Sequence, residues 1–121
     1  MILVDTSVWI DHLHNSDQVL VDLLLSDSVV THPLVVEELA LGSLARRDDL
    51  LRMLAGLSTV SVLDHGELLA LVGERRLWGK GLSPADAHLL GSALSSGDIR
   101  IWTRDKQLQY AAHELDLSYK P

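Results

Sequence analysis

Short apolar runs alternate along this chain with longer segments in which apolar residues recur every three or four positions. The short runs predict β-strands, and the longer segments predict amphipathic helices. An alternation of the two is typical of βαβ units that build a parallel sheet. We expect strands at residues 2–4, 29–31, 59–63 and 100–102, with a weaker one at 117–119.

Capping residues mark several of the predicted helix ends. Pro33 suits the first turn of one helix and Gly42 suits its end, while the pair Ser83-Pro84 begins another. The helices are expected at residues 6–14, 17–26, 33–42, 48–55, 66–78, 83–94 and 105–115. The pattern therefore predicts an α/β protein with a parallel sheet.

The composition indicates one folded domain over residues 1–121, with 47% apolar residues available for a core. Ten Lys and Arg against 17 Asp and Glu give a net charge of −7, which argues against broad electrostatic binding of nucleic acid. The lack of cysteine excludes disulfides and thiolate metal sites and fits a cytoplasmic protein. No signal peptide is recognisable, and no apolar run approaches the roughly 20 residues of a membrane span, so we expect no membrane association.

Four carboxylates occupy places that folding alone explains poorly. Asp5 ends the first apolar run, and Asp105 follows the strand predicted at residues 100–102. Glu38 and Asp86 each interrupt the apolar stripe of a predicted helix. Ligands of an open parallel sheet gather outside the carboxyl ends of its strands. Asp5 and Asp105 are expected at that edge, and we expect the two helical acids to join them.

Each of these acids also has a purely structural interpretation. Asp5 suits a turn or a cap, and Glu38 could pair with an arginine. Asp86 stands at capping-box spacing from Ser83, and Asp105 in a first turn suits the helix dipole. If the four converge, however, each close pair would repel by about 4 kcal/mol at roughly 4 Å and an effective dielectric near 20, so a divalent cation is needed between them. Oxygen-only ligands favour Mg²⁺ or Mn²⁺ over zinc.

A hard cation held by carboxylates most naturally serves phosphodiester chemistry. It would activate a water and neutralise charge at the attacked phosphate. Thr6, Ser7 and Thr103 are candidates for holding the metal-bound water by a hydrogen bond, although each is equally suited to capping a helix. Arg104 and Lys106 flank the last of the four acids, and they are the expected contacts to a phosphate backbone.

Four motifs follow one another across the whole chain: MILVDTSVWID at residues 1–11, ELALG at 38–42, DAHLL at 86–90 and WTRD at 102–105. Together, in this order and at this spacing, they resemble the motifs of PIN-domain ribonucleases. More narrowly, they resemble the VapC-type toxins of bacterial and archaeal toxin–antitoxin pairs.

This resemblance implies a three-layer α/β/α sandwich on a four- to five-stranded parallel sheet, with Mg²⁺- or Mn²⁺-dependent endonuclease activity on RNA. The family's catalytic, metal-ligating acids carry over to Asp5, Glu38, Asp86 and Asp105, and Thr103 matches the hydroxyl residue two places before the last acid. The resemblance also implies a homodimer, a structured RNA substrate such as tRNA or rRNA, and a small antitoxin that inhibits the toxin in a higher assembly.

Two other classes of function stay open at this point. A phosphoacceptor signalling domain is also a parallel α/β protein with acids at its strand ends. It needs a phosphorylatable Asp after the third strand, which Asp64 could imitate, but it leaves Glu38 unexplained. A catalytically silent module would keep the same scaffold for binding a partner. Metal-dependent RNA cleavage that is lost in Asp5→Asn or Asp86→Asn would separate the nuclease from both.

Overall fold

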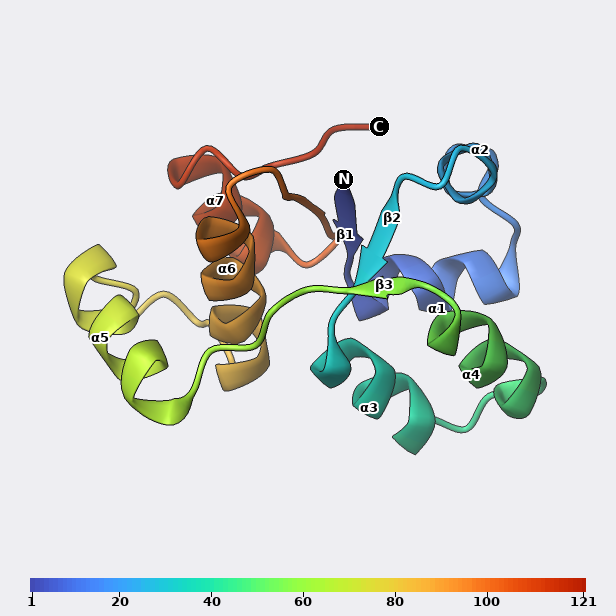
Figure 1. The fold of residues 1–121 in the computed structure, drawn as a ribbon, viewed down its shortest axis with the longest axis horizontal. Helices are drawn as coiled ribbons and strands as arrows, with labels where there is room; N and C mark the ends of the chain where they lie inside the picture. The colour runs from blue at the N-terminus through green and yellow to red at the C-terminus, as the bar shows by residue number, and fades with distance from the viewer.

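A parallel sheet of four short strands lies at the centre of the chain in the computed structural model, which describes residues 1–121 (Figure 1). The strands are β1 (Ile2–Val4), β2 (Val29–Thr31), β3 (Ser58–Thr59) and β4 (Arg100–Trp102). Their order is β3-β2-β1-β4, and Ile2 is in register with Val29 on one side and with Arg100 on the other. The predicted parallel sheet is confirmed.

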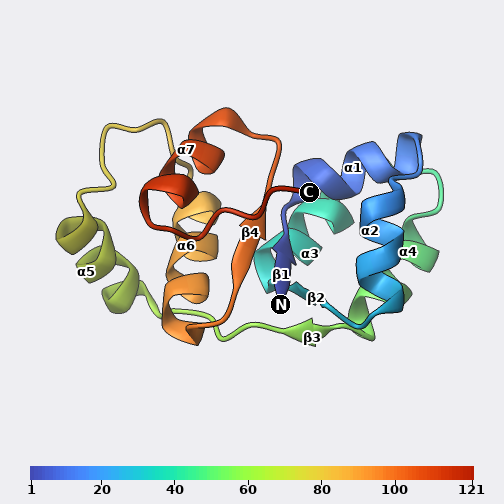
Figure 2. The same ribbon diagram turned by 90° about the horizontal axis from the view of Figure 1, so that it is seen from above.

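Seven helices cover the two faces of this sheet. In both ribbon views α6 and α7 lie on one side of the strands and α1 to α4 on the other, with α5 packed outside α6 (Figures 1 and 2). This arrangement confirms the three-layer sandwich, and none of the helices is long and apolar enough to cross a bilayer. Their bounds are α1 (Thr6–His14), α2 (Gln18–Leu25), α3 (Pro33–Leu41), α4 (Arg47–Ala55), α5 (His65–Arg75), α6 (Pro84–Ser96) and α7 (Lys106–Glu114).

The core forms around β1, whose residues are apolar on both faces. Leu3 and Val4 are completely buried, which is expected for a central parallel strand covered by helices on either side. Leu89 and Leu90 of α6 and Trp9 of α1 belong to the same buried cluster. The cluster therefore fixes the position of β1 and of the first turn of α1, which follow each other in the motif at residues 1–11.

The predicted strand at residues 59–63 is wrong in its extent. The observed strand, β3, contains only Ser58 and Thr59, although the Val60 N–H still donates to the Thr31 carbonyl at 3.0 Å. Beyond Val60 the chain leaves the sheet and reaches α5 without regular structure. Because β3 is the edge strand, no further strand is present to pair with these β-branched residues.

Two other element ends differ from the pattern or refine it. The helix predicted to reach residue 78 ends at Arg75, because Arg76 adopts a left-handed backbone conformation with φ 54°. The weak carboxy-terminal strand is present only as a single parallel bridge between Ile101 and Ser118. The sheet thus has four strands and one bridge, within the expected four to five.

Candidate active site

Three of the four predicted acids follow neighbouring strands of the sheet, and the fourth lies at the start of a helix. Asp5 follows β1 directly, and Asp105 stands three residues beyond the end of β4. Glu38 lies on α3, which begins just after β2, and Asp86 lies in the first turn of α6. In the strand order β3-β2-β1-β4 the chain continues from β1 to β2 and β3 on one side, and β4 is added on the other side of β1. The strand order therefore reverses between β1 and β4, which flank the topological switch point.

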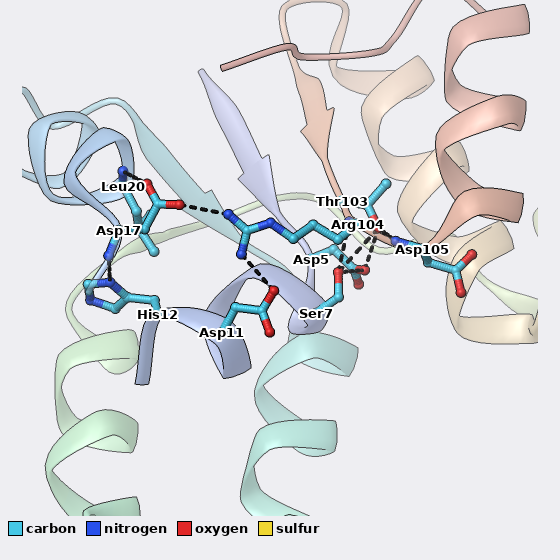
Figure 3. A network of polar contacts seen from close by, with 9 residues as sticks. All are labelled: Asp5, Ser7, Asp11, His12, Asp17, Leu20, Thr103, Arg104 and Asp105. Atoms are coloured by element: carbon cyan, nitrogen blue, oxygen red, sulfur yellow. Dashed lines mark hydrogen bonds and ion pairs between the residues drawn. The ribbon is translucent and has the colours of Figure 1, made fainter. Parts of the chain in front are cut away.

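Asp5 is the buried centre of this edge, with a relative exposure of 7%. Its Oδ2 accepts hydrogen bonds from Thr103 Oγ1 at 2.7 Å and from Ser7 Oγ at 2.9 Å (Figure 3). Those two hydroxyl oxygens accept in turn, from the backbone N–H of Asp105 at 3.0 Å and of Arg104 at 3.0 Å respectively. Asp5 occupies the N-cap position of α1, as its structural interpretation has it, but its side chain makes no capping hydrogen bond and is directed to Ser7 and Thr103 instead.

Glu38 is held from the opposite direction. Thr6 Oγ1, in the first turn of α1, donates to Glu38 Oε1 at 3.1 Å. Glu38 is an exposed residue, and the expectation that it points into the core is wrong. The buried stripe of α3 consists of Val35 and Leu39 only, and Leu41, which widened the predicted arc, is 89% exposed. Glu38 therefore lies at the rim of the site.

Asp86 and Asp105 combine a capping role with a place in the site. Asp86 Oδ2 accepts from the Ser83 N–H at 3.0 Å, and Ser83 Oγ accepts from the Asp86 N–H at 3.1 Å, so the predicted capping box is present. Asp105 Oδ1 accepts from the Leu108 N–H at 2.9 Å and caps α7. Both acids are thus fixed by the helices that they begin.

All four carboxylates are anchored in a similar way. In each, one oxygen accepts the hydrogen bonds that position the side chain, and the other oxygen accepts none. The oxygens without a hydrogen bond from the protein are Asp5 Oδ1, Glu38 Oε2, Asp86 Oδ1 and Asp105 Oδ2. Each acid is therefore anchored and still has one oxygen available to a ligand.

The four acids are also electrostatic neighbours. Partial desolvation of the Glu38 carboxyl, although the residue as a whole is exposed, raises its pKa above the ordinary value. The Thr6 hydrogen bond offsets part of this, and the charges of Asp5 and Asp86 raise the pKa further. Burial likewise raises the pKa of Asp86, partly offset by the Ser83 hydrogen bonds, with Asp105 and Asp5 adding to the rise. Their negative charges therefore act on one another across the site.

The donor set fits a hard divalent cation, although the side chains are not drawn together into a closed cage. No three acidic or histidine side chains lie close enough together to ligate one ion in the arrangement described. Mutual repulsion of like charges favours such a separation. The available oxygens are all carboxylate oxygens, the ligand type that Mg²⁺ and Mn²⁺ prefer. The four acids are the residues that would hold the ion.

Arg104, one of the two expected contacts to a phosphate backbone, is paired with aspartates of the protein itself. Its guanidinium donates to Asp11 at 2.8 Å and to Asp17 at 2.7 Å, and it lies 5.6 Å from the ring centroid of Trp102. Figure 3 shows this side chain directed toward α1 and α2, away from Asp105. Lys106, the other expected backbone contact, is exposed and forms no ion pair.

The pattern of apolar and polar positions did not single out His32, a fully buried residue that links two helices of the site. His32 Nδ1 accepts from the Leu34 N–H at 3.0 Å and so caps α3, which carries Glu38. Its Nε2 lies 3.1 Å from Ser92 Oγ on α6, the helix that carries Asp86. The only signal in the sequence is its place before Pro33, where a capping residue is expected.

The fold and the edge together define a class: a three-layer α/β protein with an acidic site at the switch point of its parallel sheet. The PIN-domain family model matches residues 2–114, and the chain belongs to the PIN-domain family.

The relatives agree with this assignment. The chain is 57% identical over 114 residues to "Ribonuclease VapC32" of two strains of Mycobacterium tuberculosis, covering 94% of this chain and 92% of that protein. The resemblance to the VapC type is therefore confirmed. Among solved structures, the crystal structure of PAE2754 from Pyrobaculum aerophilum matches with a TM-score of 0.61 and 20% identity, over 91% of this chain and 83% of that one. That match concerns the fold.

The raised pKa values of Glu38 and Asp86 predict that both charges destabilise the metal-free fold. A carboxyl whose pKa is higher in the folded than in the unfolded chain favours unfolding once it is ionised, at pH values above the raised pKa. We expect Glu38→Gln and Asp86→Asn to increase the melting temperature in EDTA at pH 7, measured by circular dichroism. Glu37→Gln is the matched control on an exposed neighbour, and an equal increase there would contradict the explanation.

His32 predicts an acid-dependent loss of stability. Burial, with a smaller effect of the His88 charge, lowers the pKa of His32 to about 4 from 6.5, so below pH 6.5 the unfolded chain binds the proton more readily than the folded one. Stability should fall between pH 6.5 and 4 by about 3 kcal/mol. Urea unfolding across this range measures the slope. His32→Asn retains a capping oxygen but does not titrate, and an unchanged slope in that variant would rule His32 out as the cause.

Proposed function

We propose that this protein is a divalent-metal-dependent endoribonuclease that acts as the toxin of a toxin–antitoxin pair. The observation that carries the proposal is the set of four anchored carboxylates, each with one available oxygen, at the carboxyl edge of a PIN-domain sheet. The similarity to a protein named as a ribonuclease of the VapC type supports RNA as the substrate class.

The chain's own residues would divide the work of hydrolysis among them. Asp5, Asp86, Glu38 and Asp105 would hold Mg²⁺ or Mn²⁺, and a bound ion of this kind supplies an activated water and neutralises charge on the phosphate. Thr103 and Ser7 fix the orientation of the Asp5 carboxylate through two charge-assisted hydrogen bonds.

Two hydroxyl groups at the start of α1 each hold a different acid of the site. Ser7 contacts Asp5, while Thr6 on the adjoining position contacts Glu38. The two residues connect the buried centre of the site to its rim. Thr6 and Thr103, both expected as supporting hydroxyls, thus act on carboxylates in this proposal rather than on the reacting water directly.

The biological setting follows from the family resemblance. A toxin of this kind would be held inactive by a small cognate antitoxin, with which a homodimer would form a higher assembly. Its substrate would be a structured RNA such as tRNA or rRNA, and it would act in the cytoplasm. The phosphoacceptor alternative gives Glu38 no role, whereas the nuclease uses all four acids.

The decisive prediction concerns cleavage of RNA by the purified chain. We expect cleavage with Mg²⁺ or Mn²⁺ and none with EDTA, measured by gel analysis of a labelled structured RNA. Asp5→Asn, Glu38→Gln, Asp86→Asn and Asp105→Asn should each lower the rate by a factor of about 100 or more, because each removes a charge that holds the cation.

The control for this experiment is the adjacent residue on the same helix. Glu37→Gln makes the same chemical change one position away, at an exposed residue, and should retain the wild-type rate. Retained folding of all variants is checked by circular dichroism. Wild-type cleavage by Asp5→Asn or Asp86→Asn would exclude this site, and no cleavage by the wild type with either metal would favour a silent binding module.

A further prediction tests the hydroxyls that hold Asp5. Thr103→Val preserves the shape of the side chain but removes the 2.7 Å hydrogen bond to Asp5, and Ser7→Ala removes the 2.9 Å one. Loss of such a supporting contact is expected to reduce metal affinity or activity by about 10- to 100-fold. Titration of cleavage rate against Mn²⁺ concentration measures this. Thr59→Val, at an exposed threonine of β3, is the control and should leave the titration unchanged.

A further inference from the structure

Some basic side chains of this protein form ion pairs with acidic side chains, and others form none. The chain has a net charge of −7, so affinity for a polyanion has to come from a local concentration of positive charge. Four of the seven arginines are held in ion pairs with aspartates: Arg46, Arg47, Arg52 and Arg104. Of the three lysines, only Lys80 forms an ion pair.

All three lysines of the chain, Lys80, Lys106 and Lys120, line two adjoining hollows along α7. One hollow, of about 380 Å³, lies between α7 and the carboxy-terminal segment and includes Lys106 and Lys120. The other, of about 220 Å³, lies between α7 and the loop before α6 and includes Lys80 and Lys106. No acidic side chain lines either hollow, and Lys106 and Lys120 form no ion pair, while Lys80 pairs with Glu114 at 3.1 Å.

An aromatic side chain lies between these lysines. Tyr110 lines both hollows and is 66% exposed, and its hydroxyl forms no hydrogen bond with the protein. Lys106, Tyr110 and His113 stand at positions i, i+4 and i+7 of α7, so they form one stripe on the helix. We call Lys80, Lys106, Tyr110, His113 and Lys120 the α7 surface. Lysines interleaved with an exposed aromatic ring suit a nucleic-acid strand, whose phosphates take the charge while a base stacks on the ring.

The α7 surface begins at the residue that follows one acid of the site. Asp105 caps α7, and Lys106 is the next residue along the chain. From Lys106 to His113 the helix rises by about 10 Å, which matches roughly three stacked nucleotides at 3.4 Å each. A strand of about three nucleotides could therefore span this stripe, whose first residue follows Asp105 in the chain.

We propose that the α7 surface binds the RNA strand on one side of the scissile bond, with Lys106 and Lys120 on its phosphates and Tyr110 stacked on a base. This inference rests on the proposed nuclease function for its substrate class. It favours RNA over an acidic protein segment, because an exposed tyrosine between unpaired lysines provides stacking as well as charge.

The test measures binding separately from cleavage. A short, labelled, mixed-sequence single-stranded RNA is titrated with the Asp5→Asn protein, with and without further substitutions, by fluorescence anisotropy at several salt concentrations. We expect Lys106→Gln and Lys120→Gln each to weaken binding severalfold and to reduce the slope of log affinity against log salt by about 0.7. Tyr110→Ala should weaken binding by about 5- to 150-fold, whereas Tyr110→Phe, which retains the ring, should not.

Two control variants separate the loss of positive charge at this surface from other effects of substitution. Lys120→Arg preserves the charge and should retain binding, and Arg52→Gln, at an arginine paired with Asp49 on α4, should have no effect. In the cleaving wild-type background, Lys120→Gln should raise KM with kcat unchanged. Unaltered affinity and salt slope in both lysine variants would overturn the proposal, as would unaltered affinity in Tyr110→Ala. Failure of the nuclease function is a separate result, an absence of cleavage by the wild type.

Discussion

The structure depends on a carboxylate that is buried at the end of its central strand. An ionised group removed from water is costly unless hydrogen bonds satisfy it. Asp5 receives two, from Ser7 and Thr103, and the hydroxyls of those residues are themselves tied to the backbone after β4. One buried charge thereby joins the segment after β1 to the segment after β4. The positions of Asp105 and of α7 follow from that connection.

The other three acids are also held in place by only one or two hydrogen bonds each. Asp86 and Asp105 cap the helices on which they act, and Glu38 is held by Thr6, so no acid depends on a flexible loop for its place. His32 adds a buried connection between α3 and α6. Rigid elements that present partly unsatisfied carboxylates are a suitable frame for a cation, because the side chains would have to close around it while the backbone that carries them is already in place.

The distribution of charge over the surface of this protein matters more for RNA binding than its net charge. The net charge of −7 is unfavourable for binding RNA, and several arginines are neutralised by aspartates, Arg104 among them. The three lysines instead line two hollows along α7, the helix that Asp105 caps. A local field of this kind can attract a polyanion to one surface even though the protein as a whole repels it.

The sequence by itself determined the parallel α/β class, the strand ends that carry Asp5 and Asp105, and the family, because hydrophobic periodicity and motif spacing are local properties. It overextended β3, since pairing at a sheet edge depends on neighbours, and it placed Glu38 in the core, since a helical stripe does not show how much of itself is covered. Only the tertiary structure decided that Arg104 turns to Asp11 and Asp17, that His32 joins α3 to α6, and that the lysines meet along α7. These contacts join residues distant along the chain, and only the packing of the elements brings such residues together.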